Sequence, residues 1–199
     1  MTAPLAFWFD FASAYSYLSA MRVEEEATRH GVEVDWRPFL LGPIFAKQGW
    51  TTSPFNVYPG KGRYMVRDIE RIAQARGLAF RMPARFPANS LLAARLAIVG
   101  RQEGWAPAFS RAVFDAAFAR GEDIASEPVL GNALAAAGLD AARVLPRGSD
   151  PAVKEALKAQ TAEAERLGIF GAPSFVTADG ELFWGDDRLE HALAWVRGR

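Results

Sequence analysis

Apolar side chains occupy every second position near the start of the chain, over residues 5–11, and the positions between them are also largely apolar. Leu5, Phe7 and Phe9 lie on one side of this pattern, and Ala6 and Trp8 lie on the other. An extended segment that is apolar on both sides is typical of a strand inside a sheet, because both of its faces are covered. The pattern therefore predicts a central strand as the first element.

The next elements are expected to complete a βαβ unit. Apolar positions recur at helical spacing from Tyr15 to about Arg29, and Gly31 suits the end of that helix. Residues 32–36 then alternate between apolar and charged side chains until Pro38 ends the pattern. This order predicts a helix over residues 15–29 and a second strand that pairs in parallel with the first.

A long loop followed by helices is predicted for the middle of the chain. Prolines and glycines interrupt residues 39–60, and we expect an irregular segment of that length to be functional. Further helices are expected to begin at Ser126 and near Asp140, and another runs from Asp150 to Gly168. Apolar residues recur at i, i+4 and i+7 in three amphipathic stripes: Met65, Ile69 and Ile72; Leu92, Leu96 and Val99; Phe109, Val113 and Ala116.

The last elements are predicted to be a hairpin and a helix. Two short apolar runs are joined through Asp179 and Gly180, a pair that supplies the positive φ angles of a tight turn. The closing helix has Asp186 or Asp187 placed to cap it. The two runs are residues 174–177 and 181–184, and the helix carries Leu189, Leu193 and Val196.

The predicted elements follow the order βαβ, helices, ββα. That is the order of an α/β, thioredoxin-like fold with an inserted all-helical domain. We expect residues 1–60 and 168–199 to form the thioredoxin-like domain and residues 61–167 to form the helical insertion. Such a fold does not by itself define an activity.

Composition excludes several kinds of chemistry. The chain has no cysteine, so disulfides and thiolate metal ligands are excluded, and any reactive thiol must come from a bound molecule. The 23 basic and 23 acidic residues balance, which favours neither nucleic acid nor an anionic membrane as a partner. His30 and His191 are expected to be solvated helix residues, and no metal site is predicted. Without a signal-like start or a membrane-spanning apolar run, we expect a cytoplasmic protein.

The junction between the first strand and the first helix carries the first candidate chemistry. Ser13 and Ser16 have the spacing of a CxxC motif in which serine replaces both cysteines. Backbone N–H groups and the dipole at a helix start would stabilise a thiolate and lower its pKa from roughly 8.5, and a serine hydroxyl can donate a hydrogen bond to it. The alternative is that Ser13 is simply the N-cap of the helix.

A proline directly ahead of a short strand carries the second candidate chemistry. A proline at such a position, here Pro173, is ordinarily a feature of an edge strand or of a strand's first residue. Opposite the first junction, however, a cis Ala172–Pro173 bond would leave the N–H and C=O of Ala172 free to pair with an extended, peptide-like ligand. We expect the two segments to form opposite walls of one site.

Five segments, in order and at compatible spacing, resemble the successive motifs of the 2-hydroxychromene-2-carboxylate isomerases. These enzymes are relatives of the kappa-class glutathione transferases and of DsbA-like thiol oxidoreductases. Five motifs in order are far more specific than any one of them. The segments span nearly the whole chain and read FDFASAYSYL, NVYPGKGRYMVRD, RFPANS, GIFGAPSF and FWGDDRL.

The resemblance implies a homodimer that binds glutathione and a small aromatic acid. It implies that Ser13 is the catalytic serine, and that Ala172 and Pro173 pair with the cysteine of glutathione. Two carboxylates can bind the ammonium of the γ-glutamyl end, although simple capping suits at least one of them. The segment implied to receive that end comprises Trp184, Gly185, Asp186 and Asp187.

Four further contacts are implied on the substrate side. Lys61 matches a lysine expected to meet a carboxylate of glutathione or substrate, and its alternative is a solvated loop lysine. Asn56, Asn89 and Tyr15 are candidate substrate contacts, although each asparagine could equally be a turn residue.

The chain departs from the family pattern at several positions. Ala14 stands where the family usually has proline, which loosens the first turn of the helix without removing the Ser13 hydroxyl. Thr52 is the nearest match to an asparagine that kappa-class enzymes place in the long loop, so the resemblance does not extend to that glutathione contact. Alanine at position 172 replaces a branched residue, which matters little because the backbone makes the contact.

Three functions remain open from the sequence. The first is a glutathione-dependent isomerase that interconverts 2-hydroxychromene-2-carboxylate and trans-o-hydroxybenzylidenepyruvate in naphthalene breakdown, by reversible addition of a thiolate. The second is a kappa-like glutathione transferase that acts on another electrophile and consumes the thiol. The third is a non-catalytic thioredoxin-like binding module.

Overall fold

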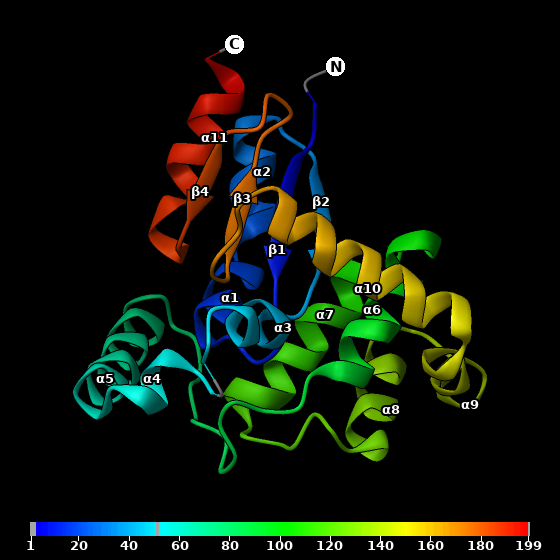
Figure 1. Cartoon of the computed structure of the whole chain (residues 1–199). Helices are drawn as coiled ribbons and strands as arrows, with labels where there is room; N and C mark the ends of the chain where they lie inside the picture. The colour runs from blue at the N-terminus through cyan, green and yellow to red at the C-terminus, as the bar shows by residue number, and fades with distance from the viewer. Residues whose placement is uncertain (1–2, 51, 199) are drawn as a thin grey trace.

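A four-stranded sheet forms the centre of the protein. The computed structural model describes residues 3–50 and 52–198. The strands are β1 (Leu5–Phe9), β2 (Val34–Pro38), β3 (Ser174–Val176) and β4 (Leu182–Trp184), in the order β2-β1-β3-β4. β1 pairs in parallel with β2 and antiparallel with β3, which pairs antiparallel with β4. The predicted central strand and its parallel partner are thus confirmed (Figure 1).

The hairpin between β3 and β4 is confirmed, but its turn differs from the expected one. Gly180 has a φ of 89°, whereas no described residue other than glycine has a positive φ. The Gly180 N–H donates to the Thr177 carbonyl oxygen at 2.9 Å. Asp179 therefore belongs to an ordinary turn that a left-handed glycine completes, and the prediction that both residues have positive φ was wrong.

Two helices replace the helix predicted over residues 15–29. They are α1 (Ala14–Ala20) and α2 (Val23–His30), and Gly31 ends the second at a φ of 64° as expected. Arg22 interrupts the run because its backbone leaves the helical region, at φ −133° and ψ −15°. Its guanidinium reaches Asp186 in the C-terminal segment, a long-range contact that a local pattern does not reveal.

The loop predicted over residues 39–60 is largely helical, and that prediction was wrong. It contains α3 (Leu41–Lys47), α4 (Pro54–Val57) and the start of α5 (Pro59–Ala75). Pro43 lies in the first turn of α3, and α4 and α5 each begin with a proline. Proline is tolerated in the first turn of a helix because the N–H it lacks has no partner there.

The helices predicted for the rest of the chain are confirmed. Ser126 and Asp140 occupy the N-cap positions of the helices predicted to begin there, and Asp150 occupies that of the long helix after them. A π-helical turn over Asp115–Ala119 follows α7, and a 3-10 turn over Leu145–Ser149 follows α9. The helices are α6 (Leu91–Glu103), α7 (Ala106–Phe114), α8 (Glu127–Ala136), α9 (Ala141–Val144), α10 (Pro151–Arg166) and α11 (Leu189–Arg197).

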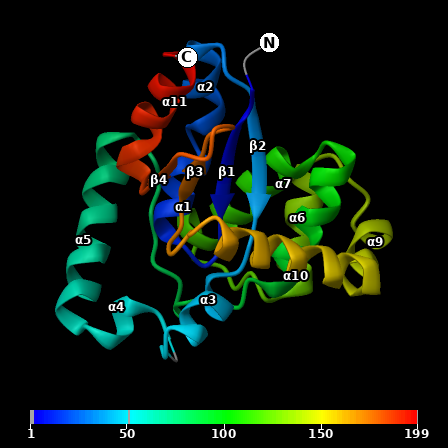
Figure 2. The same cartoon turned by 45° about the horizontal axis from the view of Figure 1, so that its top comes forward.

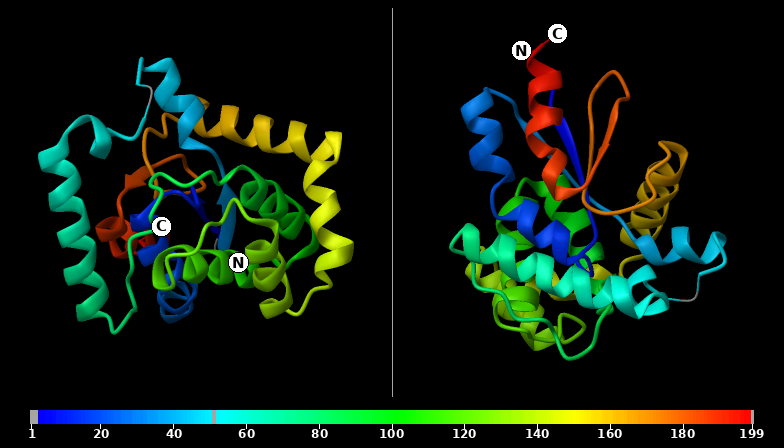
Figure 3. Two further views of the ribbon diagram at one scale, coloured as in Figure 1. Left: turned by 90° about the horizontal axis from the view of Figure 1, so that it is seen from below. Right: turned by 90° about the vertical axis from the view of Figure 1, so that its left-hand side faces the viewer.

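Helices cover both faces of the sheet. Leu5, Phe7 and Phe9 enter the larger core together with residues of α1, α7 and α11. Trp8 packs on the other face with Phe39 and with residues of α3 and α10. α4 and α5 stand apart from α6 to α10, as Figure 2 and Figure 3 show. The division into a thioredoxin-like domain and a helical insertion stays a prediction. Among the described residues, no helix is both long and apolar enough to cross a bilayer.

Candidate active site

Ser13 is a half-buried residue at the turn between β1 and α1. Its hydroxyl oxygen accepts a hydrogen bond from the Ser16 N–H at 3.1 Å, so that Ser13 is the N-cap of α1. The capping contact is thus confirmed. Because α1 has only seven residues, few peptide dipoles add up at its start. The Ser13 hydroxyl is therefore the group at this junction that we consider for a ligand.

The same hydroxyl reaches across the molecule. Ser13 Oγ donates to the Ala172 carbonyl oxygen at 2.8 Å, which joins residues 159 positions apart in the sequence. The Ala172–Pro173 peptide bond is cis. The expected meeting of the two segments is confirmed, but the expectation that the Ala172 carbonyl is free was wrong, because Ser13 occupies it.

An aromatic wall borders this contact. Trp184 is 53% exposed, and the centroid of its ring lies 4.8 Å from that of exposed Phe170. A Cβ at Gly171 would lie 2.2 Å from Trp184 Nε1, so the indole closely covers the residue before Ala172. The Gly185 N–H donates to the Pro173 carbonyl oxygen at 3.0 Å and fixes the Trp184 segment beside the proline.

Asp186 is buried and fully engaged within the protein. Its Oδ1 accepts from Ser19 Oγ at 2.9 Å and from Arg76 Nη1 at 3.1 Å, and its Oδ2 accepts from Arg76 Nη2 at 2.7 Å. Arg22 adds a further ion pair at 3.4 Å. Two guanidinium groups already neutralise this carboxylate, and its role in receiving a ligand ammonium stays a prediction.

Asp187 differs from its neighbour in exposure. Its side chain is 74% exposed and pairs with the adjacent Arg188 at 3.4 Å. The N-cap of α11 is Arg188, and no side chain caps the helix, so the expected capping by Asp186 or Asp187 was wrong. Asp187 is therefore the carboxylate of this pair that is accessible to a ligand.

Asp10 is a buried carboxylate at the end of β1 that the sequence pattern did not single out. Its Oδ1 accepts from the Ala12 N–H at 2.9 Å and from Ser90 Oγ at 2.8 Å, and its Oδ2 accepts from the Leu41 N–H at 2.8 Å. Burial raises the pKa of Asp10, and these three hydrogen bonds counteract that rise by stabilising the charged form. The available signal was a lone charge within the apolar residues 5–11.

The substrate candidates lie outside this buried centre. Lys61 is exposed at the start of α5, with its Nζ 4.9 Å from the centroid of the Tyr58 ring. Asn56 Nδ2 donates to Thr52 Oγ1 at 3.0 Å and to the Phe86 carbonyl oxygen at 3.3 Å. The Asn89 side-chain oxygen accepts from the Leu91 N–H at 3.1 Å, which is a turn contact. The described contacts do not join Lys61, Asn56 or Asn89 to Ser13.

Tyr15 links the two parts of the site. Its hydroxyl donates to Asp68 Oδ2 at 2.9 Å, which connects the first turn of α1 to the middle of α5. Burial and the neighbouring Asp68 carboxylate both raise the pKa of Tyr15. The phenol therefore stays protonated, and its hydroxyl donates to Asp68 on α5.

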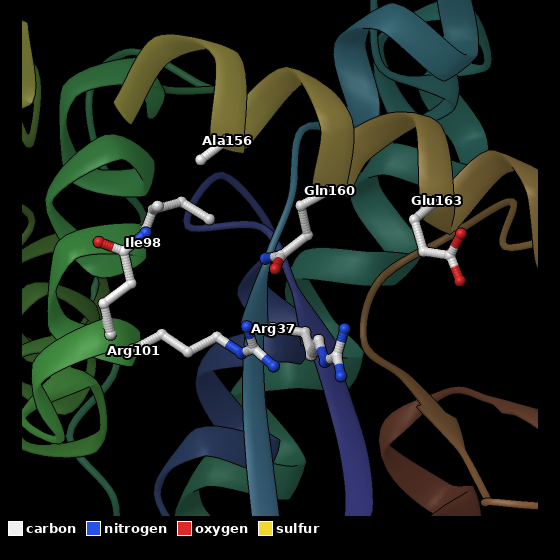
Figure 4. Close-up of a pocket in the computed structure, with 7 residues that line it drawn as sticks. Arg37, Ile98, Arg101, Ala156, Gln160 and Glu163 are labelled. Atoms are coloured by element: carbon white, nitrogen blue, oxygen red, sulfur yellow. The ribbon is translucent and has the colours of Figure 1, made fainter. Parts of the chain in front are cut away.

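A separate hollow of about 210 Å³ lies between β2, α6 and α10 (Figure 4). Arg37 and Arg101 line it, and both pair with the same carboxylate, Asp35, at 2.6 Å and 2.8 Å. Glu163, also in the lining, pairs with Arg166 at 2.7 Å. None of the candidate site residues lines this hollow, so it is separate from the site around Ser13.

The profile of the DSBA-like thioredoxin domain matches residues 4–194. The chain therefore belongs to the DsbA-like thioredoxin domain family, which confirms the thioredoxin-like fold predicted from the element order. The absence of cysteine sets it apart from members that exchange disulfides through their own CxxC motif.

More specific relatives confirm the resemblance to the 2-hydroxychromene-2-carboxylate isomerases. The chain is 30% identical to a protein of that name from Sphingobium xenophagum, over 98% of this chain and 99% of the relative. A solved structure of a 2-hydroxychromene-2-carboxylate isomerase superposes with a TM-score of 0.85 at 28% identity, over 98% of this chain and 94% of that one. Glutathione S-transferase kappa 1 from Rattus norvegicus is 27% identical, over 98% and 90% of the two chains.

Proposed function

We propose that the protein is a glutathione-dependent isomerase that interconverts 2-hydroxychromene-2-carboxylate and trans-o-hydroxybenzylidenepyruvate in aromatic catabolism. The observation that carries the proposal is the hydrogen bond from Ser13 Oγ to the Ala172 carbonyl oxygen, at 2.8 Å. It sets a hydroxyl donor beside a backbone acceptor in a chain without cysteine, where a thiol has to be borrowed. The names of the relatives support the substrate class.

Bound glutathione would supply a thiolate, whose addition to the conjugated double bond moves the π electron pair onto the conjugated carbonyl oxygen. The carbon–carbon bond, now single, can rotate, and return of the electron pair expels the thiolate and restores the double bond. Ser13 would hold the sulfur, since its hydroxyl can turn from the Ala172 carbonyl and donate to the thiolate. That hydrogen bond lowers the pKa of the thiol because it favours the charged form. The Ala172 carbonyl would then accept a backbone N–H of glutathione in place of the hydroxyl. The exchange leaves no acceptor without a donor.

The γ-glutamyl end would lie along the aromatic wall. Asp187 is the accessible carboxylate for its ammonium, and Trp184 supplies an exposed apolar surface beside it. Gly185 holds both residues next to Pro173 through its hydrogen bond at 3.0 Å. Asp186 is left out of the proposed contact because its two arginines already neutralise it.

The aromatic acid would bind between this centre and α5. Lys61 would meet a carboxylate, because an exposed ammonium at the start of α5 can form a charge-assisted hydrogen bond. Asn56 and Asn89 would contribute polar contacts at the same edge. Tyr15 would act by holding α5, since its hydroxyl already donates to Asp68.

The test is an isomerisation assay with purified protein, in which free thiol is counted during turnover. The proposal expects conversion only when glutathione is present, with the amount of free thiol unchanged. Consumption of one thiol per product would instead support a kappa-like transferase, the second candidate, which the rat relative favours. No conversion of either kind, with glutathione still bound, would leave a binding module.

A homodimer and a cytoplasmic location belong to the same proposal. Light scattering of the purified protein tests the dimer, and a monomer mass at assay concentration would contradict it. The location follows from the proposed need for reduced glutathione, which the cytosol maintains.

A further inference from the structure

Asp10 lies where three segments of the candidate site meet. Ala12, whose N–H it accepts, precedes Ser13 directly. Leu41 begins α3, the first helix of the segment that leads to Asn56. Ser90 follows Asn89 and is the N-cap residue of α6. One side chain thus contacts three segments that are far apart in the sequence.

The shape of the Ser13 turn also depends on Asp10. The Asp10 carbonyl oxygen accepts the Ser13 N–H at 2.9 Å, while its Oδ1 accepts the Ala12 N–H at 2.9 Å. The backbone and the side chain of one residue therefore close two overlapping turns. Ser13 then projects its hydroxyl to Ala172 from the end of this doubly bonded turn.

A carboxylate suits this position better than an uncharged side chain of the same shape. Two of its three donors are backbone N–H groups, of Ala12 and Leu41, which cannot reverse their polarity. Asparagine would place its own N–H₂ group against one of them. Asp10 forms no ion pair in the described part of the chain, and its pKa is set by burial and by hydrogen bonds. This distinguishes Asp10 from Asp186, which two arginines neutralise.

We infer that Asp10 is a positioning residue, which holds the Ser13 turn, the start of α3 and the start of α6 in one arrangement around the bound thiol and the aromatic acid. The inference rests on the proposed function for its ligands, whereas the positioning itself is a property of this chain. Asp10 does not touch the reacting atoms in this scheme. It acts through Ser13 and through Ser90, the residue that follows Asn89.

The test compares Asp10→Asn with Ser90→Ala, which removes a single one of the three hydrogen bonds. Asp35→Asn is the matched control, because Asp35 also accepts several hydrogen bonds, but from Arg37 and Arg101, which line the separate hollow. The readouts are the pKa of bound glutathione from its thiolate absorbance, the KM for the aromatic acid, and hydrogen exchange of the Ser16 N–H. That amide reports the Ser13 turn because it donates to Ser13 Oγ.

Asp10→Asn is expected to raise the pKa of the bound thiol and to speed Ser16 exchange, because the Ser13 turn loses a hydrogen bond that holds it. KM is expected to increase roughly tenfold, because displaced polar groups bind the acid more weakly. Ser90→Ala is expected to increase KM with a smaller change in thiol pKa, and Asp35→Asn to change neither. A lowered thiol pKa in folded Asp10→Asn would mean that Asp10 acts through its charge, and would overturn the inference. An unchanged thiol pKa and an unchanged KM in that variant would also overturn the inference.

A wild-type protein without any thiolate signal would contradict the proposed function instead. Ser16 exchange still decides the inference in that case, since it needs no ligand. Faster exchange in Asp10→Asn than in Asp35→Asn supports the positioning role, and equal exchange overturns it.

Discussion

The Ser13 junction and the α4–α5 segment, residues 54–75, are built in different ways. The junction is bonded from several directions: Ser13 contacts Ala172 and Ser16 directly, and its backbone bonds to Asp10. The α4–α5 segment instead exposes large side chains, of which Tyr64 is 63% exposed. The hydrogen bond from the Tyr15 hydroxyl to Asp68 joins this segment to the first turn of α1.

The difference indicates that the two regions have different roles. A group that activates a thiol has to be held accurately, which a half-buried junction with several hydrogen bonds achieves. A surface that selects among aromatic acids needs only the right shape and charge. Changes at the junction are therefore expected to affect thiol activation, and changes in the α4–α5 segment to affect which acid is bound.

The largest effect is expected from Ser13→Ala. Removal of the donor should lower kcat/KM by about a hundredfold or more, the range seen when a donor to a developing anion is lost. Loss of the N-cap should cost only about 1 kcal/mol of folding free energy. Steady-state kinetics and thermal unfolding measure the two. Ser110→Ala is the control, because that buried hydroxyl has no hydrogen-bond partner among the described residues, and equal losses in both variants would contradict the assignment.

Lys61→Met tests the other side of the comparison. The variant keeps the length of the side chain but loses its charge, so KM for the aromatic acid should rise roughly tenfold, as expected for a lost charge-assisted hydrogen bond. The pKa of bound glutathione should stay constant. Lys158→Met is the control, since Lys158 is an exposed lysine on α10. A changed thiol pKa in the Lys61 variant would place this residue in the activating centre.

Tyr15→Phe should have a smaller effect of the same kind. It removes the bond to Asp68 while retaining the ring, and KM should increase by roughly threefold, in line with the loss of one hydrogen bond of about 0.5–1.5 kcal/mol. Titration of bound glutathione should match wild type. A large fall in kcat at constant KM would show that the phenol contacts the reacting atoms.

Asp35→Asn is expected to have the smallest effect, and to change only the folding stability. Burial opposes ionisation of Asp35, but Arg101 and Arg37 outweigh it and hold its pKa below the ordinary value of 3.8. A carboxylate with a lowered folded-state pKa stabilises the protein above 3.8 and loses that contribution as the pH falls through the folded-state value. The variant should be destabilised by about 1 kcal/mol at neutral pH. The difference from wild type should shrink below pH 3.8, and a difference that grows there would contradict the assignment.

The sequence predicted the elements that local patterns determine. Alternation revealed β1 and β2, and helical spacing revealed α5, α6 and α7, because one buried face fixes such a period. Patterns failed where distant contacts decide the structure. Arg22 leaves its helix, where its side chain meets Asp186, and prolines interpreted as loop residues begin α4 and α5.

The candidate site was predictable to a similar extent. The junction at Ser13 and the segment at Ala172 follow from the motifs, and the structure brings them together. The engagement of Asp186 by Arg76 was not predictable, because those residues are 110 positions apart. The role of Asp10 was not predictable, because its three partners are two backbone amides and a serine, none of which has a recognisable sequence signature.

The most direct test of the central claim is an ultraviolet difference titration of the protein with glutathione near neutral pH. If Ser13 activates a borrowed thiol, saturable thiolate absorbance appears in the wild type and is lost in Ser13→Ala, while Lys61→Met retains it. The absence of thiolate absorbance at saturating glutathione, or an equal signal in Ser13→Ala, would contradict the account.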